Sequence, residues 1–82
     1  MTNAQVRMAR AAVNWTVRDL AEAAGVHRNT ISNIEVGRYA GDPSTLALIE
    51  KALRKAGVDF IDENGGGPGV RLRKPSKTLK RS

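Results

Sequence analysis

Two short helical patterns, separated by a glycine, constrain the fold more than any other feature of the sequence. In TVRDLAEAAG, four apolar residues recur at the spacing of one helix face, and Ile31 and Ile34 repeat this spacing in the next segment. Gly25 and Gly37 follow the two patterns, and glycine is the residue that most often ends a helix. Thr16 is a good N-cap for the first of these helices, with Asp19 as the acid of a capping box. The sequence therefore predicts two short helices joined by a tight turn.

Two further helices are predicted on either side of this pair. In NAQVRMARAAV, the residues Val6, Ala9 and Val13 form one apolar stripe, and Asn14 can end the helix because asparagine tolerates the left-handed conformation. In TLALIEKALRKAG, apolar residues again recur at helical spacing, with Ser44 as the expected N-cap. The expected fold is a compact, mostly α bundle.

The pattern changes after Gly57 from a period of about 3.6 to a period near 2. VDFI and VRLR, on either side of a glycine-rich segment, predict a short β-hairpin. A two-stranded hairpin is marginal alone, so it must pack on the helices or on another subunit. We divide the chain into a helical domain (1–57), a β-hairpin that is a possible dimerisation element (58–73) and a disordered basic tail (74–82).

The third helix, expected over about 28–36, is polar along one side. At about 100° per residue, Ile31 and Ile34 face one way. The opposite side carries a guanidinium, two carboxamides and a hydroxyl, from Arg28, Asn29, Ser32 and Asn33. Such groups can bind base edges, since arginine can bridge guanine and asparagine can bridge adenine. A simple solvated face is the alternative, but this side contains no Glu or Lys, the commonest residues of such faces.

These segments resemble a known family of regulators. WTVRDLAEAAGVHRNTISNIEVGR followed by PSTLALIEKAL is similar to the lambda-repressor-like, Cro-type family, also called the xenobiotic-response-element family. The specific marks are DLAEAAGV and TISNIEVG, and the resemblance covers about residues 5–57. It implies a compact bundle of four or five helices with a helix-turn-helix, dimeric binding to inverted-repeat operators and, usually, repression.

The resemblance also implies roles for individual residues. The base-reading positions of the family correspond to Arg28, Asn29, Ser32 and Asn33. The expected contacts to the DNA backbone come from Thr16, Arg18, His27, Arg38 and Tyr39. In many members a structural salt bridge stands where this chain has Arg10 and Glu35. Val17 departs from the family, because relatives often place there a Gln that touches DNA.

The net charge of +6 is concentrated at one end of the chain. Residues 1–64 contain eight basic and eight acidic residues, whereas RLRKPSKTLKRS contains six basic residues and no acid. We expect this segment to add sequence-independent affinity for DNA, although a solubilising end is the simpler explanation.

Several classes of protein are not expected. Cysteine is absent and there is a single His, so we expect no metal site, and no nucleophile–base pair suggests an enzyme. No apolar run approaches the roughly 18 residues of a membrane span. We expect a protein of the cytoplasm that associates with the nucleoid through DNA, without a cofactor or an evident small-molecule ligand.

The sequence thus predicts a sequence-specific DNA-binding transcriptional regulator, a repressor that binds double-stranded operator DNA as a homodimer. The hairpin is expected to contribute to the dimer interface through Phe60, Ile61, Val70 and Leu72. The alternative is a protein-interaction module, an antitoxin or antiactivator, that uses the same bundle to sequester a protein partner.

Overall fold

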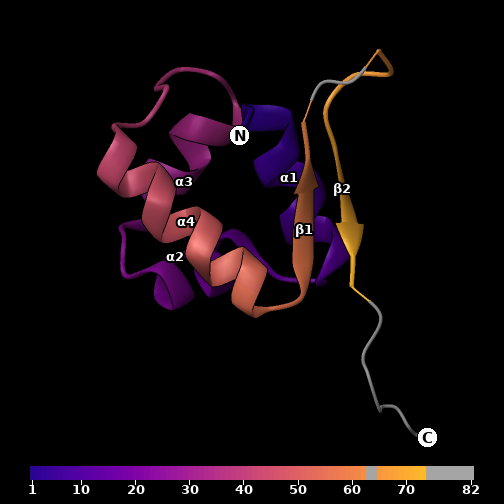
Figure 1. The fold of residues 1–82 in the computed structure, drawn as a ribbon. Coiled ribbons are helices and arrows are strands. Elements are labelled where there is room, and N and C mark those ends of the chain that lie inside the picture. The colour runs from indigo at the N-terminus through magenta and orange to yellow at the C-terminus, as the bar shows by residue number, and fades with distance from the viewer. Residues whose placement is uncertain (63–64, 74–82) are drawn as a thin grey trace, which may run out of the picture.

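The computed structural model describes residues 1–62 and 65–73, and this part of the chain contains four helices and two strands. The helices are α1 (Asn3–Ala12), α2 (Val17–Ala24), α3 (Arg28–Glu35) and α4 (Pro43–Lys55), and the strands are β1 (Val58–Ile61) and β2 (Gly69–Leu72). The helices form a bundle, and the hairpin lies at its side, next to α1 (Figure 1). The expected mostly α fold with a C-terminal hairpin is confirmed. The expected tail, 74–82, lies outside the described residues.

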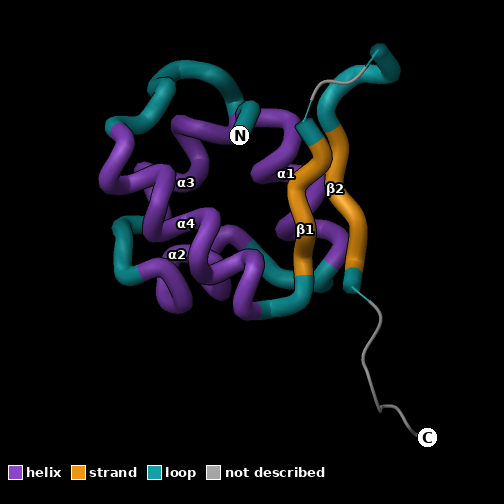
Figure 2. Tube along the Cα trace, in the orientation of Figure 1, coloured by secondary structure: helices purple, strands orange, loops and turns teal. Residues whose placement is uncertain are grey.

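The hydrophobic core lies where the helices and the first strand meet (Figure 2). Every helix and β1 contribute to it, and the largest fully buried side chains are Leu20, Ile31, Ile49, Leu53, Val6 and Val58. Full burial of each such side chain contributes about 1.5–3 kcal/mol. Trp15 and Phe60 are partly buried against this cluster. Short helices that would be marginal alone are therefore stabilised by one shared core.

The helix ends follow local signals in the first half of the chain. Thr16 Oγ1 accepts a hydrogen bond from Asp19 N at 3.0 Å, and Thr16 N donates to Asp19 Oδ2 at 2.9 Å, which is the expected capping box. Asn14 has a φ of 60° at the end of α1, and Gly25 has a φ of 72° at the end of α2. The third helix ends at Glu35, so Val36 is its C-cap rather than its last residue.

The expected cap of α4 was wrong. Asp42, not Ser44, is the N-cap, and its Oδ1 accepts from Thr45 N at 2.8 Å. The Ser44 hydroxyl instead donates to the same oxygen at 2.8 Å. Pro43 occupies the first turn, where its missing N–H costs nothing. The hydrogen bond from the Thr45 backbone, followed by that from Ser44, lowers the pKa of Asp42, because both bonds stabilise the ionised carboxylate.

The loop between α3 and α4 is packed against the bundle at Gly41. This residue has a φ of 84°, and a Cβ added there would lie 2.9 Å from Leu46 Cδ2 and 3.3 Å from Ile34 Cδ1. A side chain at this position would therefore collide with α4 as well as strain the backbone. Gly41 therefore constrains the path of the chain as it enters α4.

The hairpin is antiparallel, with Val58 opposite Leu72 and Phe60 opposite Val70. The guanidinium of Arg73 forms an ion pair with Asp59 at 2.8 Å. It also donates to the carbonyl oxygen of Arg54. Arg73 was expected to belong to the unpaired basic segment, but it closes the open end of the hairpin.

Gln5 holds the other end of the hairpin to α1. Its side chain is buried, and Nε2 donates to Ile61 O at 3.0 Å and to Gly69 O at 2.9 Å. Its Oε1 accepts from Thr2 N at 2.8 Å, within a capping box of α1. One carboxamide therefore caps α1 and joins both strands to that helix.

We predict that Gln5→Ala destabilises the fold by about 1–3 kcal/mol, because it removes the buried hydrogen bonds that join α1 to Ile61 and Gly69 of the hairpin. Urea unfolding measures the change, and amide exchange of the hairpin should accelerate more than that of α2. Lys51→Ala, on the exposed side of α4, is the control and should leave both measurements unchanged. A Gln5→Ala chain as stable as the control would contradict this role for the carboxamide.

Candidate nucleic-acid interface

Helices α2 and α3, joined by the turn at Gly25, lie on the side of the bundle away from the hairpin (Figure 1). Ile31 is 0% exposed and Ile34 is 2% exposed, so they fix the inner side of α3. On the other side, Arg28, Asn29 and Ser32 are exposed and Asn33 is partly buried. The four residues expected to read bases thus share one helix, and three of them are open to a ligand.

The N-terminus of α3 is capped by His27. The backbone N–H of Asn29 donates a hydrogen bond to Nδ1 of His27 at 3.0 Å. Nδ1 of the imidazole is therefore the acceptor that caps the helix. The other ring nitrogen, Nε2, makes no described contact, and the side chain is exposed. In this tautomer Nε2 carries the proton, so His27 can fix the helix end and still donate a hydrogen bond outward.

Arg18, in the first turn of α2, shares a groove with the start of α3. A shallow groove between the two helices is lined by Arg18, Glu22, His27 and Arg28, among others. Arg18 meets Glu22 at 3.7 Å, but both side chains are about three-quarters exposed, so this pair is weak and leaves Arg18 available. The backbone N–H of Asp19 is bonded to Thr16, which leaves the N–H groups of Val17 and Arg18 at the start of α2 for an anion.

Thr16 is less available than expected for DNA. Its hydroxyl and its backbone N–H are both bonded to Asp19 in the capping box of α2. The hydroxyl could still donate its own proton to a phosphate, because it acts only as an acceptor in the box.

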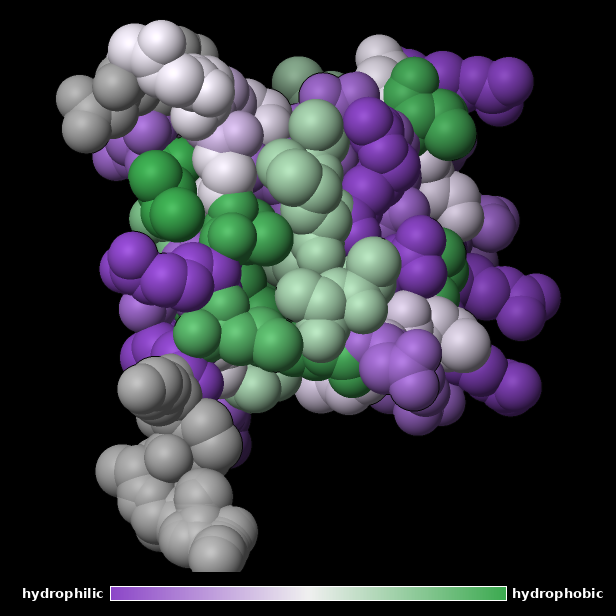
Figure 3. Space-filling model, turned by 90° about the vertical axis from the view of Figure 1, so that its right-hand side faces the viewer, coloured by the Kyte–Doolittle hydropathy of each residue, from purple (hydrophilic) through white to green (hydrophobic). Residues whose placement is uncertain are grey.

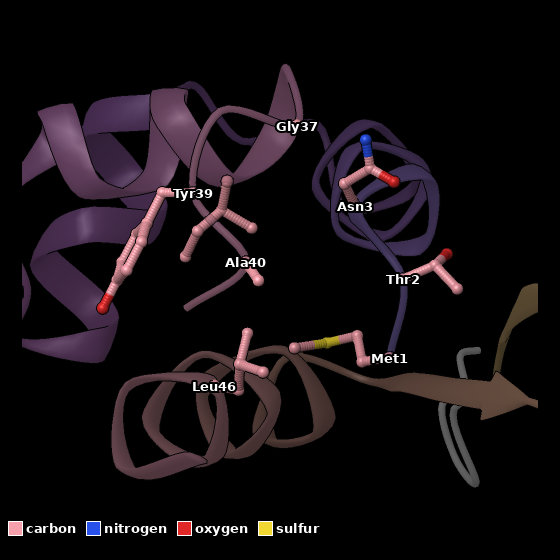
Figure 4. Close-up of a pocket in the computed structure, with 8 residues that line it drawn as sticks. Met1, Thr2, Asn3, Gly37, Tyr39, Ala40 and Leu46 are labelled. Carbon is pink, nitrogen blue, oxygen red and sulfur yellow. The ribbon is translucent and has the colours of Figure 1, made fainter. Parts of the chain in front are cut away.

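After α3, the chain presents Val36, Arg38 and Tyr39. Val36 is 65% exposed, and Arg38 is exposed without an acidic partner among the described residues. The Tyr39 hydroxyl accepts from Asp42 N at 3.2 Å, so it braces the loop. Tyr39 also lines a cleft of about 440 Å³ with Leu46 and the first residues of the chain (Figure 4).

Glu35 fastens the C-terminal end of α3 to α1. Its carboxylate receives a bidentate pair from Arg10, with Nε–Oε2 at 2.7 Å and Nη2–Oε1 at 3.0 Å. The Glu35 side chain is 6% exposed and that of Arg10 is 24% exposed. The hydrogen bond to Glu35 raises the pKa of Arg10. This buried, bidentate pair is stronger than an ordinary surface pair.

Two residues that sequence reasoning missed complete this anchor. Arg7 Nη1 donates to the backbone carbonyl of Glu35, and Asn3 Nδ2 approaches the same oxygen at 3.5 Å. The last carbonyls of a helix have no partner within it, so these contacts satisfy one of them. The sequence carries a weak signal for this role, since both residues lie on the same helix as Arg10 and face one side of it.

Comparison with protein families agrees with this geometry. A helix-turn-helix family model matches residues 6–60, which is more than half of the chain. The chain belongs to the lambda-repressor-like helix-turn-helix family of DNA-binding transcription regulators. A search among curated proteins found no match.

The described residues also bear on metal binding and on membrane insertion. Among them there is no group of three or more His, Cys, Asp or Glu that could hold a metal ion. None of the helices in the described part is long and apolar enough to cross a membrane. The family itself is one of DNA-binding regulators and is generally not enzymatic.

We predict that Arg10→Ala lowers the free energy of unfolding by about 1.5–3 kcal/mol, because it leaves the buried Glu35 carboxylate without its charged partner. Chemical denaturation measures the loss. The double substitution Arg10→Met with Glu35→Leu removes both charges and should recover much of the stability. If the double variant loses as much free energy of unfolding as its two single substitutions do together, the interaction between Arg10 and Glu35 does not stabilise the fold.

Proposed function

We propose that this protein is a transcriptional repressor that binds inverted-repeat operators as a homodimer. The observation that supports this proposal best is the polar side of α3, where Arg28, Asn29 and Ser32 are exposed without an acidic partner among the described residues. An exposed arginine and an exposed carboxamide at the start of a helix suit the edges of guanine and adenine in the major groove.

The proposed roles divide by position. Specificity comes from Arg28, Asn29, Ser32 and Asn33, and orientation comes from contacts to phosphates. These phosphate contacts are proposed for Thr16, Arg18, His27, Arg38 and Tyr39. Arg18 and Arg38 supply charge, whereas the other three supply polar groups that fix the register of the protein on the duplex. Arg10 and Glu35 act on DNA only by fixing α3.

Binding to its own upstream DNA tests the proposal. We expect footprinting to show two protected half-sites whose centres are about one helical turn apart, roughly 10–10.5 base pairs, or a multiple of that spacing. We also expect transcription from the bound promoter to fall. Weak binding that is equally salt-sensitive on every sequence would contradict a repressor and favour the protein-interaction module.

We predict that Arg28→Ala reduces discrimination at particular base pairs by about 1–3 kcal/mol and leaves thermal stability unchanged, because the side chain is exposed. Arg38→Ala is the matched control, since it removes another exposed arginine without a described acidic partner. It should weaken binding to all sequences alike. Gel shifts on the operator and its single-base variants measure both effects, and a uniform loss for Arg28→Ala would make it a phosphate ligand.

A further inference from the structure

The outer edge of β2 carries backbone groups that point away from β1. Arg73 N donates to Gly57 O at 2.8 Å, so these opposite residues form a hydrogen-bonded pair. Along an antiparallel ladder, hydrogen-bonded pairs alternate with pairs whose N–H and C=O groups point away from the partner strand. Arg71 therefore turns its backbone groups toward β1. Val70 and Leu72, one residue to either side of it, turn their N–H and C=O groups outward.

This edge is open to solvent. In Figure 1, β2 is the outer strand of the hairpin and forms one side of the molecule. The outward N–H and C=O groups of Val70 and Leu72 have no backbone hydrogen bond among the described residues. An unpaired edge of this kind is a template for another strand.

The side chains beside the edge are apolar. Leu72 is 51% exposed and Val70 is partly buried, and both lie on the face of the hairpin that packs on the bundle. Helix α1 packs beside β2, and its Met8 is 38% exposed. Figure 3, which looks onto this side of the molecule, shows hydrophobic surface over the hairpin that continues as a paler band across the neighbouring region. The open edge is thus bordered by apolar side chains.

We propose that β2 pairs edge to edge with β2 of a second copy of this chain. The proposal rests on the proposed homodimer and specifies how it forms. A twofold axis at Arg71 places Val70 opposite the partner's Leu72 and Leu72 opposite the partner's Val70. All four residues turn their backbone groups outward, so each opposite pair can exchange both of its N–H···O bonds. The two hairpins then form one continuous antiparallel sheet.

The described residues favour this register over a one-residue shift and over an axis at Val70. A shift that moves the partner by one residue would bring inward-facing groups to the edge, and it would also turn the side chains to the other face. A shift that brings Val70 opposite its own copy would place Leu72 opposite the partner's Pro68, which has no N–H to donate. The axis at Arg71 avoids both defects within β2, because it pairs the outward-facing Val70 and Leu72 with each other.

The charges on the other face of the sheet do not favour pairing. Arg71 and Asp59 are opposite residues in each hairpin, but the carboxylate of Asp59 forms its ion pair with Arg73 at 2.8 Å. The continuous sheet would place the two Arg71 side chains side by side at the axis, where like charges oppose pairing. The backbone hydrogen bonds and the apolar side chains must therefore drive the association.

The proposal narrows the expected dimer surface. Val70 and Leu72 belong to it, and Met8 of α1 joins them. Ile61 lies on the other face of the hairpin, since it follows Phe60 directly and successive side chains of a strand point to opposite faces. Phe60 is covered by the guanidinium of Arg54, which stands 5.4 Å from the centre of its ring, so it supports the sheet from within.

Leu72→Pro tests the edge directly, because it removes an outward N–H and none that faces β1. We expect it to raise the dimer dissociation constant in sedimentation by at least about tenfold, with the helical circular dichroism spectrum unchanged. Leu72→Val keeps the N–H and most of the apolar surface, and it should dimerise like the original chain. Leu72→Pro should still bind an isolated half-site, with the loss confined to inverted repeats.

Amide exchange of the unmodified chain gives a second measurement that does not depend on a variant. In the dimer we expect the amides of Val70, Arg71 and Leu72 all to be protected, and dilution to the monomer should release Val70 and Leu72 but not Arg71. Edge pairing would be contradicted if the Leu72→Pro variant stays dimeric, or if the amides of Val70 and Leu72 exchange freely in the dimer. Either result would leave the homodimer itself in place. A chain that is monomeric at every concentration and on DNA would overturn the homodimer as well.

Discussion

The attachment of Glu35 to α1 is the interaction on which the presentation of α3 depends. The carboxylate is held by Arg10 at 2.7 Å, and the backbone carbonyl of the same residue accepts from Arg7. The side chain and the backbone carbonyl of Glu35, at the end of α3, are therefore both held by α1. Because Ile31 and Ile34 fix the inner side of α3, the position of the helix is set without using its polar residues. Arg28, Asn29 and Ser32 remain open for this reason.

Helix α1 connects the two surfaces that matter for the proposed function. Asn3, Arg7 and Arg10 bind the end of α3, while Gln5 on the same helix binds both strands of the hairpin. If two hairpins pair, the orientation of each α3 is then determined through one rigid element. A dimer that reads two half-sites needs such a fixed relation, since the half-site spacing leaves little freedom in the distance between reading helices.

The features that could be predicted from the sequence are those determined by nearby residues. The capping box of Thr16 and Asp19 spans three positions, and Asn14 and Gly25 end helices through their own backbone preferences. Asp42 was missed because Ser44 is an equally good cap, and Pro43 between them decides where the helix begins. Gln5 could not be assigned, since its partners Ile61 and Gly69 lie 56 and 64 residues away. For the candidate site, helical periodicity alone separated the polar side of α3 from its buried side.

The distribution of charge bears on how the proposed repressor would bind DNA. Several cations of the described residues are engaged within the fold: Arg10 with Glu35, Arg54 with Glu50, and Arg73 with Asp59. Paired charges contribute little to the counterion release that drives nonspecific binding. Arg28 and Arg38, which have no such partner among the described residues, flank the polar side of α3. On the proposed function, Arg28 adds its charge to a contact that depends on the base, whereas Arg38 adds its charge to a phosphate contact that does not.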